Sequence, residues 1–442
     1  MMTRDAEKNG FGRGQVQYRL KDWGVSRQRY WGTPIPMIYC DKCGTQPVPI
    51  EELPVELPII EEFTGRGKSP LAQVSDFVDT ACPACGGEAR RETDTMDTFV
   101  DSSWYFYRYC DPKNDSAPFD IDKVKYWAPI DFYSGGVEHA ILHLIYSRFF
   151  CKVFRDLGLV QHDEPFERLL TQGMVLRHGN VMSKSKGNVV DPDEMTATFG
   201  ADALRLYEMF VAPPEKEIEW TDTGLEGSAR FLGRVWRLVM PFAPVISTGD
   251  IPGLDAVDLG DAERNLRRKT HNTIRRVSED LHPRVHLNTA VSALMELVND
   301  LYGYCENMKL GPMASDPDRS MTEASSASLA VVQEGTEALV LLLSPFTPHL
   351  AEELWEAMGH DDGVELAGWP EYDESVARAE ELVLPVQVNG KVRARMTVPI
   401  DTPDGTLKEM ALSQPQVRAH TEGKEIRRVV LVQRKLVSIV AK

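Results

Sequence analysis

Three things are scarce in this 442-residue sequence: cysteine, long apolar runs and an excess of basic residues. No apolar run reaches the length that a bilayer-crossing helix needs, and the first residues, MMTRDAEKNGFGRG, lack the apolar core of a secretory signal. We therefore expect a cytoplasmic protein. The formal net charge of −18 argues against a nonspecific nucleic-acid binder, although a specific one could carry local basic patches. The composition excludes disordered and fibrous classes, and the length allows two to four domains.

The seven cysteines are few and odd in number, and four of them form two CxxC pairs, Cys40/Cys43 and Cys82/Cys85. In a reducing compartment this arrangement favours a metal site over disulfide bonds. A glycine follows each pair, as a knuckle turn requires when backbone N–H groups face thiolates. The pattern predicts a structural Zn²⁺ bound by all four cysteines. Two pairs of reduced surface thiols are the alternative.

A short cationic segment, VMSKSKGN at residues 181–188, lies between an apolar run and an Asp191–Pro192 turn. Its small and polar residues are typical of a mobile loop and exclude a buried strand or an amphipathic helix. Ammonium groups and free backbone N–H donors stabilise the charge that develops on a departing polyphosphate. The segment therefore indicates a polyphosphate-binding loop, with an ordinary solvated turn as the alternative.

Residues 130–157 have the pattern of a buried strand, a glycine turn at Gly135–Gly136 and a long helix from residue 137. In a doubly wound sheet such a turn lies at the carboxyl edge of the strands, where ligands bind beside a helix N-terminus. Two glycines leave room there for a ribose or an adenine. The pattern thus predicts a nucleotide site.

The residues after these glycines could contact such a nucleotide. Glu138 could accept hydrogen bonds from ribose hydroxyls, and His139 and His143, four residues apart, would share one face of the helix. A structural role for the histidines and a metal-binding pair are the alternatives. No third metal ligand is evident nearby.

Several of these segments resemble one enzyme family. VMSKSKGN resembles the KMSKS signature of class I aminoacyl-tRNA synthetases, and TQGMVLRHGNVMSKSKGNVVDP is similar to bacterial-type leucyl-tRNA synthetases in particular. GGVEHAILHL, GADALRLY and APPEK match the same family in the same order, as does the end of the chain from VQVNGKVRARMTVP to KLVSIVAK. One position departs, because Val181 stands where the family has the first lysine of its signature.

The resemblance implies ATP with Mg²⁺, leucine and tRNA(Leu) as substrates. Lys184 would neutralise charge on the leaving pyrophosphate, Lys186 would be a second donor, and His143 would support the adenylate. The other residues implied at the ATP or adenylate site are Gly135, Gly136, Glu138, His139, Met174, Val175, Met182, Ser183 and Ser185.

Helical periodicity begins at residue 224, and further helices are predicted at about 259–281, 286–308, 325–343 and 347–358. They would form a bundle that resembles the anticodon-binding domains of the leucine, isoleucine, valine and methionine synthetases. Beyond it, an Asn389–Gly390 turn between two strands predicts a hairpin, and helices near 403–421 and two later strands complete a small α/β domain.

Basic residues gather in three places, where a solvated face is the alternative to contact with RNA phosphates. The candidate tRNA-binding residues are Arg27, Arg29 and Trp31 within RLKDWGVSRQRYWGTPIP, then Arg268 and Arg275 among the basic residues of the second bundle helix (264, 267, 268, 269, 275 and 276), and Lys391, Arg393 and Arg395 on one strand of the hairpin. The basic residues at 427, 428, 434 and 435 extend the last group.

The predicted fold class is α/β: the second half of a class I Rossmann-type catalytic domain with a zinc-binding insertion, followed by an α-helical bundle and a small α/β C-terminal domain. We call the cationic segment at residues 181–188 the lysine loop. The expected domains are a segment that returns from an editing insertion (1–36), the zinc module (37–95), the half-domain with the lysine loop (96–223), the helical domain (224–375) and a tRNA-contacting domain (376–442).

The family also has a HIGH-type motif and an inserted editing domain, and no HxGH spacing occurs in this chain. We therefore expect the C-terminal part of a leucine-tRNA ligase that needs an N-terminal half for activity. A non-catalytic tRNA-binding protein and a zinc-held scaffold subunit are the rivals. Neither rival needs both the nucleotide segment and the lysine loop.

Overall fold

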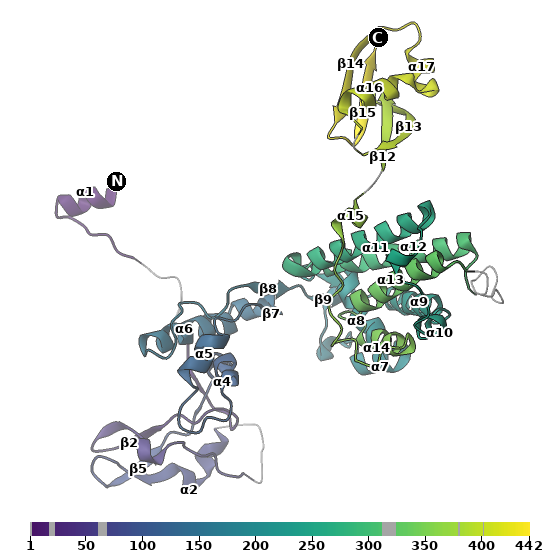
Figure 1. Cartoon of the computed structure of the whole chain (residues 1–442). Coiled ribbons are helices and arrows are strands. Elements are labelled where there is room, and N and C mark those ends of the chain that lie inside the picture. Colours follow the sequence, from purple (N-terminus) through teal and green to yellow (C-terminus); the bar gives the residue numbers. More distant parts are fainter. Residues whose placement is uncertain (1, 17–22, 61–68, 312–323, 379–380, 401) are drawn as a thin grey trace. The chain divides into compact units, whose positions relative to one another are not determined.

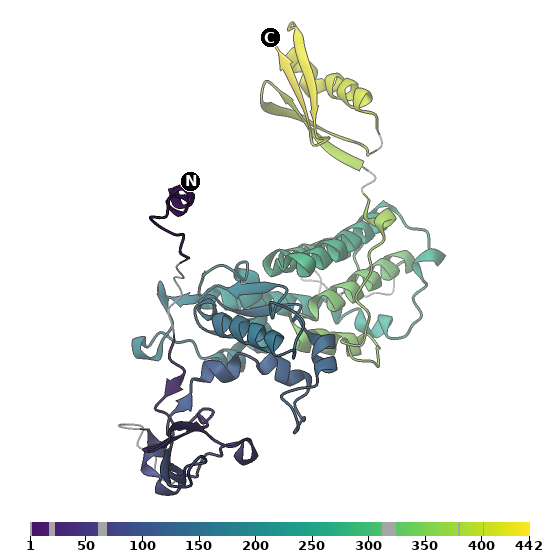
Figure 2. The same ribbon diagram turned by 90° about the vertical axis from the view of Figure 1, so that its left-hand side faces the viewer.

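The structure, a computed structural model, describes residues 2–16, 23–60, 69–311, 324–378, 381–400 and 402–442. It divides into two compact units, residues 1–172 and 173–442, which we describe separately. Figures 1 and 2 show their elements from two directions. The part of the basic and aromatic run at residues 19–22 lies outside the described residues.

The first unit contains a small antiparallel sheet, which is formed by an insertion between strands β1 and β6. Its strand order is β3-β2-β5-β4, and the paired strands β1 and β6 bring the two ends of the insertion together. The elements are α1 (Met2–Lys8), β1 (Ser26–Arg27), β2 (Met37–Cys40), β3 (Gly44–Pro47), α2 (Ser75–Val78), β4 (Asp79–Ala81), β5 (Glu88–Arg91) and β6 (Thr95–Met96). The apolar core of this sheet is small and includes Ile38 and Val48, so the fold has little hydrophobic stabilisation of its own.

The rest of the first unit is a strand–helix–strand unit with helices before it. Strands β7 and β8 are parallel, and the segment that contains α6 connects them. The elements are α3 (Thr98–Ser102), α4 (Tyr105–Cys110), α5 (Ile121–Trp127), β7 (Tyr133–Gly136), the 3₁₀ helix η3 (Val137–Ala140), α6 (His143–Asp156) and β8 (Leu169–Gln172). Two parallel strands joined through a helix are the repeating element of a doubly wound sheet.

The second unit begins with a three-stranded sheet, β10-β9-β11, in which β9 pairs antiparallel with β10 and parallel with β11. Its elements as far as the bundle are β9 (Val175–Arg177), β10 (Asn180–Val181), the 3₁₀ turn η4 (Lys184–Lys186), α7 (Pro192–Phe199), α8 (Ala201–Val211) and β11 (Ile218–Glu219). Ala203 and Tyr207 of α8 pack with Trp220 and Leu225 in one apolar cluster beneath this sheet.

A helical bundle follows, and its predicted helices are confirmed to within a few residues. It comprises α9 (Asp222–Val239), α10 (Ala243–Ile246), η5 (Leu254–Ala256), α11 (Asp261–Glu279), α12 (Leu287–Met308), α13 (Ser326–Leu343), α14 (Pro348–Ala357) and α15 (Glu374–Ala377). Leu294, Leu297 and Leu301 of α12 are fully buried at its centre. This largest core of the chain arises because each helix has one apolar stripe that faces the others.

Helix α13 differs from the sequence-based expectation that no segment could cross a membrane. Within the described residues it is the one helix that is long and apolar enough by length and composition, but 61% of it is buried inside the structure. Because it lies at the centre of the bundle, it needs apolar residues on most of its faces.

The last four strands form a mixed sheet with the order β13-β12-β15-β14, covered on one face by two helices (Figure 1). The elements are β12 (Glu381–Val388), β13 (Lys391–Pro399), α16 (Asp404–Ser413), α17 (Pro415–Thr421), β14 (Ile426–Val432) and β15 (Leu436–Ala441). Asn389 and Gly390 both have positive φ, 50° and 82°, so the predicted two-residue hairpin turn is confirmed.

A buried carboxylate connects α8 to the bundle. Asp202 accepts hydrogen bonds from the backbone N–H of Leu350 at 2.7 Å and from Nδ1 of His349 at 2.9 Å. These groups lie in the first turn of α14, where backbone N–H groups have no partner within the helix. Arg205, also on α8, donates to the carbonyls of Pro345 and Phe346 just before α14.

We predict that Asp202→Ala loosens this junction without unfolding the chain. An unsatisfied N–H at a buried helix start costs about 1–3 kcal/mol, so hydrogen exchange of the first α14 amides should accelerate about tenfold or more. Mass-spectrometric exchange of the peptide spanning residues 345–357 measures it. Glu226→Ala, which removes an exposed carboxylate paired with Arg230, is the control and should change nothing there. Unchanged exchange in the Asp202 variant would contradict this role.

Candidate functional site

The two glycines of the predicted nucleotide segment belong to a strand, which corrects the expectation of a tight turn. Gly135 and Gly136 pair with Thr171 and Gln172 of β8, and Gly136 has φ −67° and ψ 156°. The parallel ladder extends through both glycines, so the chain turns only afterwards, in η3. The helix consequently begins at His143 and not at residue 137.

The glycines are nevertheless positions with little space. A Cβ on Gly136 would lie 2.2–2.5 Å from the carboxylate atoms of Glu138, and one on Gly135 would lie 3.3 Å from the His139 ring. Glu138 and His139 are exposed, with 61% and 48% of their side chains accessible. Both side chains therefore lie over the strand end, and a side chain at either glycine would displace them from this position.

His139 and His143 lie on different elements, which corrects the prediction that they share a helix face. Their rings still meet edge to face, with centroids 5.8 Å apart. His143 is buried, and its Nε2 lies 2.6 Å from the Tyr133 hydroxyl, while its Nδ1 lies 3.4 Å from the Ser102 hydroxyl. Burial, and to a smaller extent the charge of His139, lower the pKa of His143 below 6.5. His143 is therefore a neutral, fixed hydrogen-bonding group at neutral pH.

The lysine loop is carried by a hairpin of the second unit. His178 and Gly179 have φ 56° and 69°, so they form a two-residue turn between β9 and β10, which the sequence analysis did not identify. Gly173 precedes β9, and a Cβ there would lie 2.0 Å from the carbonyl oxygen of Lys216. The APPEK turn thus packs directly against the entry to β9, close to Met174 and Val175.

One side chain, Asn188, closes the loop. Its Oδ1 accepts the backbone N–H of Ser183 at 2.9 Å, and its Nδ2 donates to the carbonyls of Val181 and Arg177. Between these anchors the chain makes a 3₁₀ turn that ends at Gly187 with φ 64°. The sequence analysis quoted Asn188 without giving it a role; an amide side chain after a Lys-Gly turn is the signal that could have identified it.

The closed loop fixes the position of the lysines. Met182 is half-buried against the apolar cluster of Tyr207 and Trp220, whereas Lys184 and Lys186 are exposed. Lys186 Nζ lies 3.4 Å from Oδ1 of Asn180, and the Ser183 and Ser185 hydroxyls lie 3.2 Å apart. Within the described ranges neither lysine has a carboxylate partner, so both ammonium groups are available to an anion. The nucleotide segment and the lysine loop lie in different units.

The four cysteines of the CxxC pairs converge in the small sheet of the first unit. Their Sγ atoms all lie within 4.8 Å of one another, and those of Cys40 and Cys85 are 3.8 Å apart. Gly44 and Gly86 have φ 72° and 68°, as the knuckle turns require. Hydrogen bonds from the backbone N–H groups of Cys43 and Lys42 lower the pKa of Cys40 to about 7. Four sulfurs on a tetrahedral Zn²⁺ are separated by about 3.8 Å, so the cluster fits this metal.

Comparisons with known proteins agree with this arrangement. Residues 14–221 match the family model described as "tRNA synthetases class I (I, L, M and V)", and residues 263–410 match the anticodon-binding domain of tRNA ligase. The leucine–tRNA ligases of Geobacter sp. (strain M21) and Symbiobacterium thermophilum are 51% and 49% identical to the chain over 98% and 99% of its length. The chain belongs to the leucyl-tRNA synthetase family.

A solved structure is also similar to this family member along its whole length. It is the ternary complex of the Agrobacterium radiobacter K84 LeuRS with tRNA and LeuAMS, which has a TM-score of 0.82 and 37% identity and covers 100% of this chain. The chain covers 55% of that protein and 50% and 52% of the two ligases. It therefore spans about half the length of the curated relatives it matches.

The predicted tRNA contacts of this synthetase-family chain differ in how free their side chains are. Arg27 pairs with Asp97, the N-cap of α3, and donates to the carbonyls of Gly24 and Ser26. Its guanidinium thus fixes the backbone before β1 next to the start of α3. Arg29 is exposed, and Trp31 has 77% of its surface accessible. Arg268 and Arg275 on α11 each donate to an asparagine one turn earlier.

The basic residues of the last sheet form two separate groups, which corrects the expectation of one patch. Lys391, Arg393 and Arg395 are exposed on β13, but the pairing with β12 skips Arg393, so the predicted regular alternation on one face is interrupted there. Arg427 and Arg428 lie on β14, at the opposite edge of the sheet. Arg434 pairs with Asp404 and with the carbonyls of Ile400 and Thr402, so its role is structural.

We predict one zinc ion per chain in protein purified without chelators, with loss of the metal when either CxxC pair is changed to serine. Each variant leaves only two thiolates, too few for a closed tetrahedral site. Elemental analysis measures the metal, and Cys110→Ser, which changes a cysteine outside the cluster, is the control. Zinc-free protein, or full zinc content in the serine variants, would contradict this site.

His143 predicts a pH dependence of stability. Its pKa is lower in the folded chain than the 6.5 of the unfolded chain, so the unfolded chain binds more protons below pH 6.5. Stability should consequently decrease as the pH decreases below about 6.5. His143→Gln should flatten this dependence in urea-unfolding midpoints, and His420→Gln, which changes an exposed histidine, should not. The pKa of half-buried His162 is lowered in the same way, so part of the slope should remain.

Proposed function

We propose that this chain is the C-terminal part of a cytoplasmic leucine-tRNA ligase that activates leucine with ATP and transfers it to tRNA(Leu). The observation that carries the proposal is the lysine loop, in which Asn188 holds Lys184 and Lys186 at an exposed rim with no carboxylate partner in the described structure. A non-catalytic tRNA binder needs no such loop. Its presence in a chain about half identical to leucine–tRNA ligases supports catalysis.

In the first step a carboxylate oxygen of leucine attacks the α-phosphorus of ATP. The bond from that phosphorus to the bridging oxygen breaks, and pyrophosphate leaves with the electron pair. Lys184 neutralises the charge that develops on the leaving oxygens, and Lys186 is the second donor. Mg²⁺, when bound, supplies further positive charge to the phosphates. In the second step a terminal ribose hydroxyl of the tRNA attacks the leucyl carbonyl, and AMP leaves.

The strand end of the first unit holds the adenosine side of the substrate. The carboxylate of Glu138 accepts hydrogen bonds from the ribose, with His139 beside it. Neutral His143, at the buried start of α6, supports the adenylate. The Tyr133 hydroxyl and Ser102 orient the His143 ring, so this ring needs no rearrangement when the adenylate forms. The rate then depends on positioning and electrostatics, without a covalent enzyme intermediate.

An N-terminal half with the HIGH-type motif would supply the other side of the ATP site. The exposed apolar side chains beside the strand end support such a partner. Ile141, Leu142 and Phe149 have 72%, 45% and 49% of their surfaces accessible, which is unusual for neighbouring apolar residues. Burial of this patch by the N-terminal half would complete the site and stabilise the first unit.

The test is leucine-dependent ATP–pyrophosphate exchange. We expect none from the isolated chain and restored, leucine-specific exchange after the chain is mixed with the N-terminal half of a leucyl-tRNA synthetase. In the reconstituted enzyme Lys184→Ala should reduce adenylate formation on the order of 10²-fold or more, as for loss of one preorganised donor. Transfer from preformed adenylate should decrease less, because pyrophosphate has already left.

Two controls give this experiment a clear outcome. Lys152→Ala removes a partly exposed lysine of the first unit, outside the loop sequence, that is paired with Glu164, and should leave exchange unchanged. Val181→Lys should raise activity only a fewfold, because this position lies at the rim of the loop. Failure of the mixture to exchange while the chain still binds tRNA would favour the non-catalytic tRNA binder, and equal losses in both steps for Lys184→Ala would indicate a docking defect.

A further inference from the structure

A cavity of about 380 Å³ lies beside the first half of α11 and is lined by four arginines. Arg264, Arg267 and Arg268 come from α11, and Arg378 follows α15. Ser375 also lines the cavity, and Asp258 is the one carboxylate among its described lining residues. Guanidinium groups around one small cavity repel one another to the extent that nearby carboxylates do not neutralise them, so the partners of each arginine decide what the cavity can bind.

Two of the arginines are held by carboxylates but keep free nitrogens. Arg267 contacts Glu334 through Nε, at 3.1 and 3.2 Å from the two carboxylate oxygens. Its terminal nitrogens have no hydrogen bond within the described residues. Arg264 is bound more fully, to Asp261 and to the carbonyl of Leu259. Arg267 can therefore direct its terminal amino groups into the cavity while Glu334 fixes its position.

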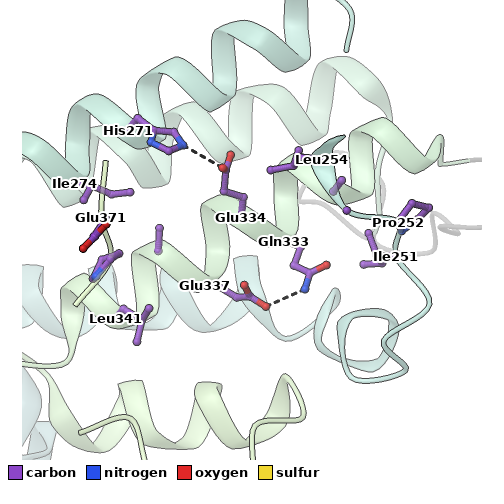
Figure 3. A pocket seen from close by; sticks show the side chains of 14 residues that line it. Ile251, Pro252, Leu254, His271, Ile274, Gln333, Glu334, Glu337, Leu341 and Glu371 are labelled. Carbon is purple, nitrogen blue, oxygen red and sulfur yellow. Dashed lines mark hydrogen bonds and ion pairs between the residues drawn. The ribbon is translucent and has the colours of Figure 1, made fainter. Parts of the chain in front are cut away.

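Glu334 is itself fixed from the other side, where a neighbouring pocket begins (Figure 3). Nδ1 of His271 accepts the backbone N–H of Asp373 at 2.9 Å, so the Nε2 of a neutral His271 donates to Glu334 at 3.0 Å. Asn272 also donates to the carbonyl of Ala377 at 2.8 Å. These bonds hold residues 373–377 along α11, so that Arg378 follows a fixed segment.

The other two arginines, Arg268 and Arg378, have side-chain N–H donors without a hydrogen-bond partner among the described residues. Arg268 donates from one nitrogen to Oδ1 of Asn265 at 2.5 Å. The backbone N–H of Arg378 donates to the carbonyl of Glu374 at 3.1 Å, but its guanidinium has no hydrogen bond within the described residues. Neither has a carboxylate partner in the described part of the chain. Asp261 and Glu334, just outside the lining, neutralise Arg264 and Arg267, so Arg268 and Arg378 carry the unpaired positive charge and Asp258 is the one carboxylate in the described lining. The local charge of the cavity is thus positive, in a chain whose net charge is −18.

We propose that this arginine pocket binds a phosphate group, either that of a free phosphate compound or one of an RNA backbone. Planar guanidinium groups match phosphate oxygens with paired hydrogen bonds, and a phosphate offers oxygens to more than one of them at once. Binding would join Arg378 to α11 and so fix the end of the segment that leads to β12. This proposal does not depend on the catalytic function, because the pocket lies wholly within the helical bundle.

The test is calorimetric titration of the 442-residue chain with inorganic pyrophosphate at constant ionic strength. Lys184→Ala and Lys186→Ala are present throughout, so that the lysine loop does not contribute. We expect one saturable site, with an affinity that decreases about tenfold or more in Arg268→Gln and in Arg378→Gln. Arg230→Gln, which removes an exposed arginine outside the pocket, should change the affinity less than twofold.

A second arm distinguishes the two sources of the phosphate. If an RNA phosphate occupies the pocket, pyrophosphate should compete with a tRNA(Leu) transcript, and Arg378→Gln should reduce the salt dependence of RNA binding by about one ion. If a free phosphate compound is the ligand, RNA binding should be unchanged by either. Absence of saturable pyrophosphate binding, or equal affinity in the arginine variants and the parent, would overturn the proposal.

Discussion

The buried carboxylate of Asp202 is the constraint that joins the lysine loop to the rest of the second unit. It occupies the start of α14, while Arg205 of the same helix binds the carbonyls just before α14. On its other side α8 contributes Tyr207, whose hydroxyl accepts the backbone N–H of Thr221 at 2.9 Å beside β11. One helix thus connects the sheet that carries the loop to the bundle. Displacement of α8 would move Lys184 and Lys186 and the bundle relative to each other.

The parts of the fold that could be predicted from sequence are those with a strong local signal. Amphipathic stripes located α9 and α11 to α14, and Asn389–Gly390 located the hairpin, because only a turn with positive φ at both positions fits that pair. The convergence of the two CxxC pairs could also be predicted, since glycines at fixed spacing after each pair build matching turns. These signals are contained within a few residues.

The errors occurred where a distant partner decides the local structure. Gly135 and Gly136 look like a turn, but pairing with β8, more than thirty residues later, keeps them in a strand. The basic residues of β13 and β14 look like one patch, but the order β13-β12-β15-β14 places them at opposite edges. The Arg27–Asp97 ion pair, which joins residues seventy positions apart, was likewise not predicted. Sequence spacing carries no information on such pairings, because sheet order and ion-pair partners are set by the folded chain.

The presence or absence of a carboxylate partner therefore distinguishes cations with a structural role from those that remain available to a ligand in this acidic chain. Arg27, Arg434 and Lys269 have carboxylate partners, and their positive charge is largely neutralised before any ligand arrives. Lys184, Lys186 and Lys391 are exposed and have no such partner among the described residues. With a net charge of −18, long-range attraction for a polyanion is weak, so binding must depend on these local, unpaired groups. Which cations remain available to an anion then follows from the partners that the fold provides, and not from how many cations the sequence contains.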